Sequence, residues 1–296
     1  MSCTGRFAPS PTGPLHFGSL LAALASYLDI RAQNGRWLVR IEDLDPPREV
    51  PGASTLILNA LEQFKLHWDG EVVYQSQRHP LYQAALDQLI HTGLAYHCQC
   101  SRKQLKLRDA QHSYDGYCRN HAPTADATTS VRAIYPDESL SFNDRIQGER
   151  VYPADPGRGD FVIFRRDGFF AYQLAVIVDD EAQGIDQVVR GADLIDETPR
   201  QMVLQHHLGY RQPSYAHIPV LTNAEGQKLS KQTFAEPLSL ERDEIRQQLI
   251  RALTLLGHIP PAEAQYSSCE EILAWAVAHW SLARVPRGLT LPPESC

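Results

Sequence analysis

The chain has 296 residues, of which 43% are hydrophobic and 21% charged, a composition that is ordinary for a globular protein of about two domains. No apolar run approaches the ~18 residues of a membrane-spanning helix, and the polar N-terminus is unlike a secretory signal, so we expect a cytoplasmic protein. The formal net charge of −7 argues against a strongly basic nucleic-acid binder, although it is compatible with a local basic groove.

The N-terminal third alternates helix and strand signals. Apolar residues at helical spacing predict a helix over 20–31, and a strand is predicted over 36–41. A second helix is predicted over 53–65. This order favours an α/β fold with a parallel, doubly wound sheet of the Rossmann type, whose first half is 1–74.

The middle of the chain, 75–186, breaks this rhythm. It combines a predicted helix over 80–90, three clustered cysteines, and two apolar runs, 161–164 and 174–178, which we interpret as strands. We therefore predict that 75–186 is an insertion between the two halves of the α/β domain. We expect this insertion to bear a metal site and to bind an acceptor substrate.

The α/β pattern resumes in 187–238, the predicted second half of the domain. Thr198, Pro199 and Gln201 have the spacing of a capping box with proline at the first helical position, which predicts a helix start. The remainder, 239–296, is predicted to be a short helical region.

Three of the six cysteines, Cys98, Cys100 and Cys118, lie within about twenty residues. In a reducing compartment such a cluster predicts a metal site rather than disulfides. Three thiolates favour a closed, structural, tetrahedral zinc site. By chemistry alone His121 is the better fourth ligand, because imidazole commonly binds zinc.

Residues 6–19 form a Pro/Gly-rich turn that leads directly into a helix. The N-terminus of a helix suits phosphate, because its N–H groups are free and carry partial positive charge. His16 can donate to a phosphate oxygen, and Gly13 and Gly18 let the backbone approach a ligand closely. Taken alone, the segment fits a rigid structural loop equally well.

Lys228 and Lys231 lie three positions apart in a polar segment. Two such cations can stabilise the charge that develops on a transferring phosphate. By itself a short lysine cluster is more often a solvated loop.

Together these two segments resemble the two signature sequences of class I aminoacyl-tRNA synthetases. The flanking blocks 39–48, 176–180 and 189–201 are similar to those of the glutamate branch, and the resemblance covers roughly 5–255. It implies an ATP-dependent ligase that uses Mg²⁺ with ATP and activates L-glutamate as its adenylate.

The resemblance also implies roles for individual residues. The catalytic residues that it implies are His16, Lys228 and Lys231. The implied ATP site comprises Pro9, Thr12, Gly13, His16, Gly18, Ser19, Lys228 and Lys231. The implied glutamate site comprises Arg6, Ala8, Ser10, Glu42, Tyr172 and Arg190. For Asp43 and Asp45, a structural role at the strand end and a ligand role are equally compatible with the sequence.

The chemistry of glutamate fits this assignment. Arg6 and Arg190 can each bind one carboxylate in a bidentate fork. Glu42 can neutralise the ammonium group, and Tyr172 can add a hydroxyl contact. Which arginine takes the side-chain carboxylate stays open.

The chain departs from the glutamate branch in several places. Ser19 replaces a second histidine of the general signature, and 20–22 lacks the arginine that usually starts the next helix. The second signature ends in Gln232 instead of serine. There is no room for the large anticodon-binding region of glutamyl-tRNA synthetases. In its short length, its segment 19–24 and its cysteine spacing, the chain resembles glutamyl-queuosine tRNA(Asp) synthetases. These paralogues place glutamate on the queuosine base of the anticodon loop.

This second resemblance implies that Tyr114 is the fourth zinc ligand, with His121 as the alternative. It further implies a monomer that activates glutamate without tRNA and transfers it to queuosine-containing tRNA(Asp). A shortened synthetase that charges a tRNA 3′ end, and an inactive nucleotide- or tRNA-binding paralogue, are the alternatives. An inactive protein is less compatible with the sequence, because the chain retains the family's functional residues Arg6, His16, Glu42, Tyr172, Arg190 and Lys231.

Overall fold

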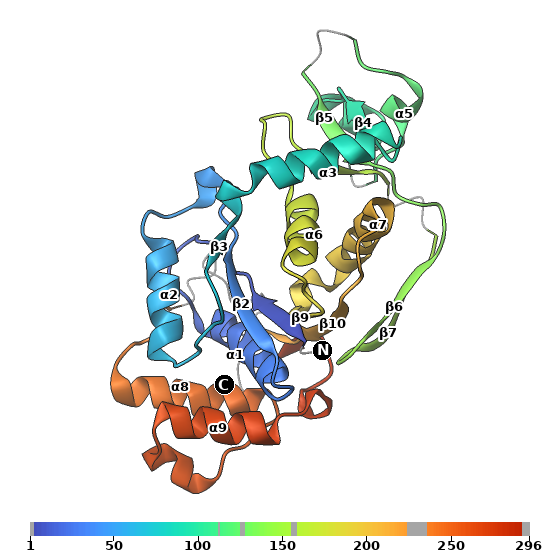
Figure 1. Cartoon of the computed structure of the whole chain (residues 1–296). Helices are drawn as coiled ribbons and strands as arrows, with labels where there is room; N and C mark the ends of the chain where they lie inside the picture. The colour runs from blue at the N-terminus through green and yellow to red at the C-terminus, as the bar shows by residue number, and fades with distance from the viewer. Residues whose placement is uncertain (1–2, 112, 125–127, 155–158, 224–235, 292–296) are drawn as a thin grey trace.

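The computed structural model describes residues 3–111, 113–124, 128–154, 159–223 and 236–291 (Figure 1). Lys228, Lys231 and Gln232 of the second signature lie outside these ranges. Within them, no helix has the length and apolar character needed to cross a membrane.

A five-stranded parallel sheet forms the centre of the fold, in the order β10-β9-β1-β2-β3. Its strands are β1 (Thr4–Phe7), β2 (Arg36–Ile41), β3 (Val73–Tyr74), β9 (Gln187–Gly191) and β10 (Ser214–Ile218). The direction of strand succession reverses between β1 and β9, which is the switch point of a doubly wound sheet. The predicted Rossmann-type sheet is confirmed, and ligands of such sheets bind beyond the carboxyl ends of the strands at this point.

Two helices of the first half of the domain follow the prediction from apolar spacing, α1 (Phe17–Arg31) and α2 (Ala53–Gln63). The predicted C-terminal helical region contains α8 (Arg242–Leu255) and α9 (Cys269–His279). Helix α1 is apolar along most of its length because it packs against β1 and β9 as well as against α8 and α9 (Figure 1). Gly257 ends the α8 segment with a φ of 78°, where a Cβ would lie 2.0 Å from the carbonyl oxygen of Arg284.

The chain between β3 and β9 builds a separate group of elements. Helix α3 (His79–His91) runs from the central sheet to a small antiparallel sheet, β4-β5-β8 (Figure 1). The strands and short helices of this part are β4 (Ala95–Cys98), α4 (Arg102–Leu107), α5 (Tyr117–Asn120), β5 (Ser130–Ala133) and β8 (Phe161–Phe164). The domain boundaries at 74, 186 and 238 stay predictions.

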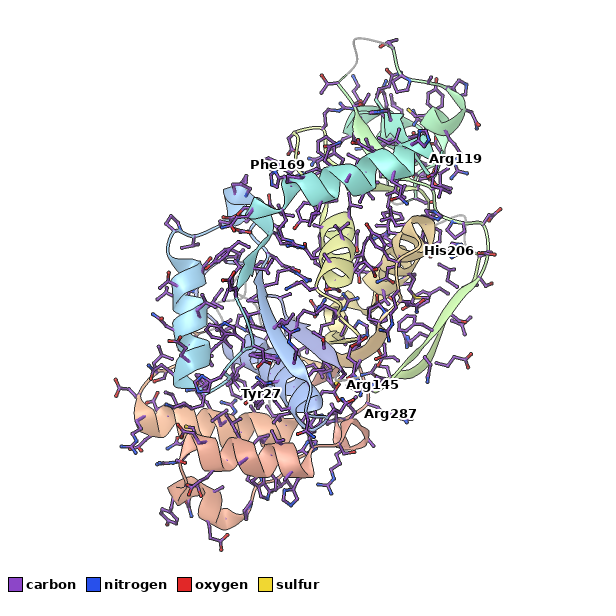
Figure 2. All side chains as sticks on the ribbon, in the orientation of Figure 1. Tyr27, Arg119, Arg145, Phe169, His206 and Arg287 are labelled. Carbon is purple, nitrogen blue, oxygen red and sulfur yellow. The ribbon has the colours of Figure 1, made fainter. Side chains whose placement is uncertain are left out.

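A hairpin from the same part of the chain returns to the central sheet. It consists of β6 (Leu140–Asp144) and β7 (Gly148–Tyr152), and at its tip the Arg145 N–H donates to the Tyr215 carbonyl at 2.9 Å. The Arg145 guanidinium also binds Asp29 of α1 at 2.6 Å (Figure 2). The hairpin is therefore in contact with both β10 and α1.

The interpretation of 174–178 as a strand is wrong, because these residues lie in helix α6 (Tyr172–Ala182). Helix α6 packs against α3 and α7 (Thr198–Leu208), and every residue from Leu174 to Asp180 is buried. A helix buried on all sides has no polar face, so its apolar run cannot be distinguished from a buried strand by periodicity.

The predicted capping box at Thr198 is also wrong. Helix α7 begins at Thr198, but the 3-10 helix η3 (Ala192–Glu197) runs directly into it, and no side chain caps it. The Thr198 hydroxyl instead accepts a hydrogen bond from Arg190 at 2.8 Å. The remaining short elements are η1 (Pro46–Arg48), η2 (Gln75–Gln77), η5 (Ala262–Tyr266), η6 (Leu282–Arg284), β11 (Val220–Leu221) and β12 (Thr290–Leu291).

Candidate active site

The residues assigned to the glutamate site converge beyond the carboxyl ends of the three central strands. Arg6 lies on β1 and Arg190 on β9, while Glu42 directly follows β2. Tyr172, the first residue of α6, is close enough to these three side chains that their charges alter its pKa. Their place at the switch point is the usual ligand position of this sheet.

Arg6 is not an unpaired cation. Its Nε donates to Oδ1 of Asp180 at 3.0 Å and its Nη2 donates to Oδ2 at 3.4 Å, and both side chains are buried. Arg40 of β2 donates to the same carboxylate at 2.9 Å. Burial opposes ionisation of Asp180, but the two arginines hold its pKa below the ordinary value. Arg6 is thus fixed by an ion pair with Asp180, a partner that it shares with Arg40 and that the sequence did not reveal.

Arg190 has a different environment, made of uncharged groups. Its Nε donates to Nε2 of His217 at 3.0 Å, its Nη1 to the Tyr172 hydroxyl at 3.4 Å, and its Nη2 to the Thr198 hydroxyl at 2.8 Å. The remaining contact of Nη2 is the Leu194 carbonyl, at 3.5 Å. In the part of the chain that the structure describes, no carboxylate forms an ion pair with Arg190. A buried guanidinium without a counter-ion is the natural receptor for an anionic ligand.

Glu42 provides the complementary charge. Its side chain is buried, and its Oε1 lies 3.5 Å from Nη2 of Arg40 in an ion pair. Among the described residues no group donates a hydrogen bond to this oxygen. Burial raises the pKa of Glu42 to about 7, although Arg40 and Arg6 act in the opposite direction. An orphan carboxylate oxygen of this kind can accept a hydrogen bond from a ligand ammonium.

The loop between β1 and α1 holds the residues assigned to ATP. Gly13 has a φ of 135°, which L side chains rarely adopt, and the Pro9 carbonyl accepts from the Glu42 N–H at 3.0 Å. His16 is the N-cap of α1, and its Nδ1 accepts from the Ser19 N–H at 3.3 Å. In the neutral ring the proton therefore lies on Nε2, where it can donate to a phosphate. Ala8, Ser10, Thr12 and Gly18 lie in or next to the same loop.

The chain that follows the second signature lies beside this loop. Pro237 pairs with His16 as an isolated bridge, and the Leu238 N–H donates to the Leu15 carbonyl at 2.9 Å. Lys228 and Lys231 themselves lie outside the described residues, so their predicted contact with phosphate stays a prediction.

Asp43 and Asp45 make contacts within the protein. Asp43 accepts from the Ser76 backbone N–H at 2.8 Å and from its hydroxyl at 2.6 Å. Asp45 pairs with Arg48 and, at 3.3 Å, with Arg165. These contacts favour the structural interpretation of both residues.

A second group of candidate residues is the cysteine cluster. The sulfur atoms of Cys98, Cys100 and Cys118 all lie within 4.8 Å of one another. Tyr114 Oη lies 3.4 Å from the sulfurs of both Cys98 and Cys100 and accepts from the Cys118 N–H at 2.9 Å. Bonds of ~2.3 Å to sulfur and ~2.0 Å to oxygen would separate zinc ligands by roughly 3.5 Å along the edges of a tetrahedron. The three thiols can therefore hold a metal, and the Tyr114 phenol lies beside two of them.

Two arginines surround this cluster. Arg108 Nη2 donates to the Cys100 sulfur at 3.2 Å, and Arg132 Nε donates to the Cys98 sulfur at 3.3 Å. Arg132 also lies over the Tyr114 ring, 3.9 Å from its centroid. Although burial opposes it, hydrogen bonds from Tyr114 and Arg132 lower the pKa of Cys98 to about 7. The lowered pKa favours the thiolate of Cys98, the form that binds metal.

His121 lies outside this group. It is exposed, its ring stacks on Tyr117 with centroids 4.3 Å apart, and its Nδ1 lies 2.9 Å from the Tyr117 carbonyl oxygen. The geometry therefore gives His121 less support than Tyr114 as the fourth ligand.

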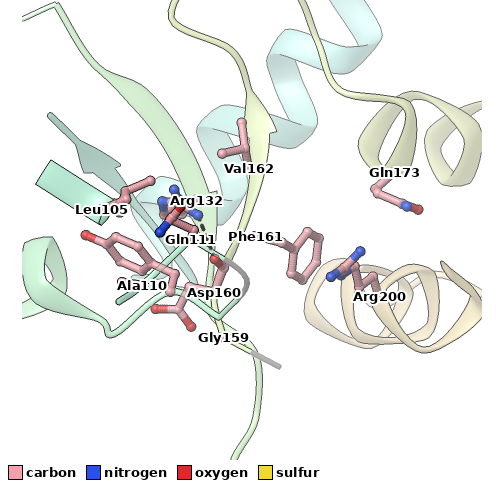
Figure 3. Close-up of a pocket in the computed structure, with 11 residues that line it drawn as sticks. Leu105, Ala110, Gln111, Arg132, Gly159, Asp160, Phe161, Val162, Gln173 and Arg200 are labelled. Carbon is pink, nitrogen blue, oxygen red and sulfur yellow. Dashed lines mark hydrogen bonds between the residues drawn. The ribbon is translucent and has the colours of Figure 1, made fainter. Parts of the chain in front are cut away.

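A cavity of about 250 Å³ lies between the cysteine cluster and the helices α6 and α7 (Figure 3). Arg132 lies on one side, and Gln173 and Arg200 lie on the other, with Phe161 between them. Tyr114 also lines the cavity. None of the residues assigned to ATP or glutamate lines this cavity.

Comparison with known proteins gave consistent matches. The family model described as tRNA synthetases class I (E and Q), catalytic domain, matches residues 2–282. The chain is 53% identical to the glutamyl-Q tRNA(Asp) synthetase of Pseudomonas paraeruginosa over 294 residues, which cover 99% of each chain. It is 48% identical to the protein of that name from Vibrio cholerae, over 99% of this chain and 95% of the relative.

Solved structures agree on the fold. A glutamate tRNA ligase from Elizabethkingia meningosepticum, in complex with its amino acid, superposes with a TM-score of 0.82 at 24% identity. That alignment covers 97% of this chain and 66% of the ligase, so the chain spans about two thirds of that protein's length. A glutamate-tRNA synthetase from Elizabethkingia anophelis gives a TM-score of 0.83, over 69% of its length.

Proposed function

Since the chain belongs to the class I tRNA synthetase family of the E and Q enzymes, we propose that it activates glutamate with ATP and transfers it to the queuosine of tRNA(Asp). In the first step the α-carboxylate of glutamate attacks the α-phosphorus of ATP, and pyrophosphate leaves. In the second step a hydroxyl of queuosine attacks the acyl carbon of the adenylate, and AMP leaves. The relatives of that name, which align over nearly their whole length, support this acceptor.

One observation carries the amino-acid part of the proposal. The buried guanidinium of Arg190 has uncharged partners among the described residues, and the buried Oε1 of Glu42 accepts no hydrogen bond from them. Both side chains lie close enough to Tyr172 to affect its pKa. A ligand that satisfies both must carry an anion and a cation a few bonds apart. An amino acid with an acidic side chain has this pattern.

The charges also suggest how glutamate is oriented. The reacting α-carboxylate must lie near the ATP phosphates, at the loop that follows β1 and bears His16. Arg6, at the start of this loop, is already paired with the carboxylate of Asp180. Arg190 lies one strand further away and forms no ion pair with a carboxylate of the described residues, so we assign the side-chain carboxylate to Arg190.

The pKa of Glu42 predicts how glutamate binding depends on pH. Glu42 binds a proton below about pH 7, and only its carboxylate form can pair with the ammonium of glutamate, so binding below this pH releases a proton. We expect the KM for glutamate to rise about tenfold for each pH unit below about 7 and to be nearly constant just above it. In Glu42→Gln the KM should be high at every pH and lose this dependence. A wild-type KM that does not change over this range would contradict the assignment.

The phosphate part of the mechanism needs positioning and charge stabilisation rather than a covalent nucleophile. The N-terminus of α1 and the Nε2–H of His16 can bind phosphate oxygens. We propose that Lys228 and Lys231, with Mg²⁺ bound to ATP, stabilise the charge that develops on pyrophosphate. The chain after Lys231 returns to His16, which supports this placement.

The proposal predicts that activation does not require RNA. The pocket residues come from the central sheet and α6 of this chain, so ATP–pyrophosphate exchange should proceed with glutamate alone. Glutamyl-tRNA synthetases of this branch need tRNA for the same step, so the measurement separates the two activities. Exchange that appears only after addition of tRNA would favour the enzyme that charges a 3′ end.

We further propose that the cysteine cluster binds one structural zinc ion, held by Cys98, Cys100, Cys118 and Tyr114. The three sulfurs and the phenol oxygen have separations that suit a tetrahedron, which supports this set. Three thiolates and a phenolate would give the site excess negative charge, which Arg108 and Arg132 can offset. Four protein ligands would leave no position for substrate.

Metal analysis of protein purified without added metal should therefore find about one zinc per chain. Cys100→Ser and Cys118→Ser should lose the metal and loosen the fold around it. Tyr114→Phe should also lower zinc affinity, whereas His121→Ala should not. Loss of zinc in His121→Ala but not in Tyr114→Phe would show that the proposed fourth ligand is wrong.

Two other functions remain as alternatives that these measurements can detect. A shortened synthetase would charge a 3′ end, and an inactive paralogue would bind nucleotide or tRNA without exchange activity. The monomeric state and the cytoplasmic location of the protein also stay predictions.

A further inference from the structure

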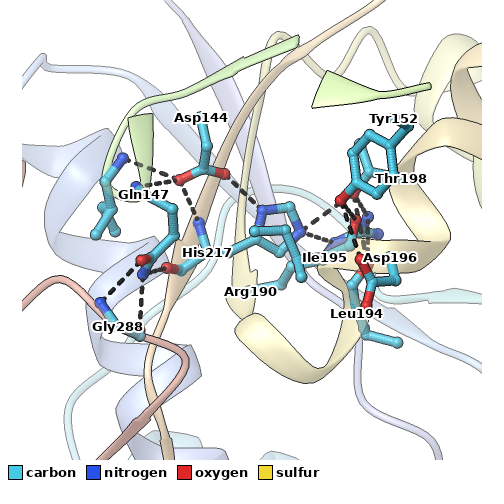
Figure 4. A network of polar contacts seen from close by, with 11 residues as sticks. Asp144, Gln147, Tyr152, Arg190, Leu194, Ile195, Asp196, Thr198, His217 and Gly288 are labelled. Carbon is cyan, nitrogen blue, oxygen red and sulfur yellow. Dashed lines mark hydrogen bonds and ion pairs between the residues drawn. The ribbon is translucent and has the colours of Figure 1, made fainter. Parts of the chain in front are cut away.

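His217 is fully buried behind the Arg190 guanidinium (Figure 4). The two residues are partners in the parallel pairing of β9 and β10. The nitrogen Nε2 of His217 lies 3.0 Å from Nε of Arg190 and 3.3 Å from the Thr198 hydroxyl. The ring therefore contacts the side of the guanidinium that faces into the protein.

The protonation state of His217 follows from its partners. A guanidinium can only donate, so Nε2 of His217 must be the acceptor and cannot carry a proton. The single ring proton then lies on Nδ1, which is 2.6 Å from Oδ2 of Asp144. Burial and the nearby Arg190 also lower the pKa of His217, which keeps the ring neutral.

Asp144 is itself fixed in one orientation. It is the last residue of β6, and its Oδ1 accepts from the backbone N–H groups of Ile146, Gln147 and His217, at 2.9, 2.8 and 3.2 Å. Oδ2 is left for the imidazole. Only a carboxylate can accept at both oxygens in this way.

We propose that Asp144 and His217 are positioning residues that hold the Arg190 guanidinium in the orientation that selects a side-chain carboxylate. This inference rests on the proposed role of Arg190 in binding glutamate. The hairpin β6–β7, which belongs to the middle part of the chain, thus contributes to the amino-acid pocket of the central sheet.

The order of the three groups explains why a histidine lies between the two charges. A carboxylate in direct contact with Arg190 would neutralise it and repel the carboxylate of the ligand. A neutral imidazole fixes the guanidinium without supplying a counter-charge. The charged groups whose fields reach His217 are Asp144 on β6, Arg190 on β9 and Asp193 in η3.

Asp144→Asn tests this arrangement without changing the size of the side chain. The three backbone donors at Oδ1 require the amide oxygen there, so the amide NH₂ must face Nδ1 of His217. The ring proton would then move to Nε2, and Nε2 could no longer accept a hydrogen bond from the Arg190 Nε–H. In tRNA-free exchange we expect the KM for glutamate to rise roughly 10- to 100-fold, the loss typical of one hydrogen bond to a charged group, with the KM for ATP little changed.

A pair of His217 variants separates positioning from packing. In His217→Gln the amide oxygen can reach the place of Nε2 and accept from Arg190, whereas in His217→Asn it reaches only the place of Nδ1. His217→Gln should therefore keep more of the preference for glutamate over glutamine than His217→Asn. Tyr152→Phe is the matched control, because its hydroxyl contacts Asp196 and the Ile195 carbonyl rather than Arg190, and the preference should be unchanged.

The preference for glutamate over glutamine is the decisive quantity, because loss of folded protein lowers both rates equally and leaves their ratio unchanged. The inference is supported if Asp144→Asn and His217→Asn lower this ratio and His217→Gln lowers it less. It is overturned if Asp144→Asn lowers only the melting temperature, or if the two His217 variants have the same ratio. If a substitution of Arg190 itself leaves the ratio unchanged, the proposed glutamate pocket fails, and this inference fails with it.

Discussion

Replacing Arg190 with methionine is expected to lower kcat/KM for glutamate in ATP–pyrophosphate exchange by ~10³-fold, the loss expected when one partner of a buried charge pair is removed. The reason is that the described partners of Arg190 are all uncharged, so the ligand carboxylate would be its main counter-ion. In the variant, that carboxylate would enter a buried pocket without a partner. Arg200→Met is the matched control, because Arg200 pairs with Glu197 on the surface of the neighbouring cavity.

The same pocket predicts that glutamine is a very poor substrate. Glutamine has nearly the shape of glutamate, so shape cannot separate the two, but it would leave the Arg190 guanidinium without an anion. We expect the wild-type protein to prefer glutamate by ~10³–10⁴-fold in kcat/KM, as in other sites whose polar groups a near-isostere leaves unpaired. In Arg190→Met this preference should fall to about tenfold or less, because glutamate loses more than glutamine does. Comparable kcat/KM values for both amino acids in the wild type would refute the pocket.

The second large effect concerns the acceptor. Aspartate tRNA from cells that cannot make queuosine should accept no glutamate, whereas queuosine-containing aspartate tRNA should accept it and other tRNAs should not. Queuosine offers a diol hydroxyl as the nucleophile, and a base of an RNA loop can be splayed out and read by its edges and by stacking. The control is guanosine-containing aspartate tRNA after enzymatic restoration of queuosine, which should regain acceptance. Equal labelling of tRNA with and without queuosine would contradict the proposed acceptor.

Much of the fold could be predicted from local signals in the sequence. Helices α1, α2 and α3 have apolar residues at helical spacing, so each was predicted close to its observed bounds. Helix α6 was mistaken for a strand because it is buried on all sides. The helix start at Thr198 was predicted with the wrong cap, because the hydroxyl of Thr198 binds Arg190 instead of the helix backbone.

The residues of the site could be predicted, but their interactions could not. The resemblance to a known family pointed to Arg6, Glu42, Tyr172 and Arg190, and the structure brings these four together. The partner of Arg6, by contrast, is 174 positions away in the sequence. The contact between Asp144 and His217 likewise joins residues 73 positions apart, and no local pattern marks either one. Only the folded chain shows that Arg6 is paired with a carboxylate, whereas Arg190 has no carboxylate partner among the described residues.

We propose that the protein transfers glutamate to a base of the anticodon loop and not to the 3′ end of tRNA. The most direct test is to react the protein with ATP, radioactive glutamate and queuosine-containing aspartate tRNA, digest the product with nucleases, and identify the labelled nucleoside. The proposed function predicts that the label co-migrates with queuosine and that prior removal of the 3′ CCA end leaves labelling intact. Label on the 3′-terminal adenosine, abolished by trimming that end, would show that the protein is a 3′-charging synthetase.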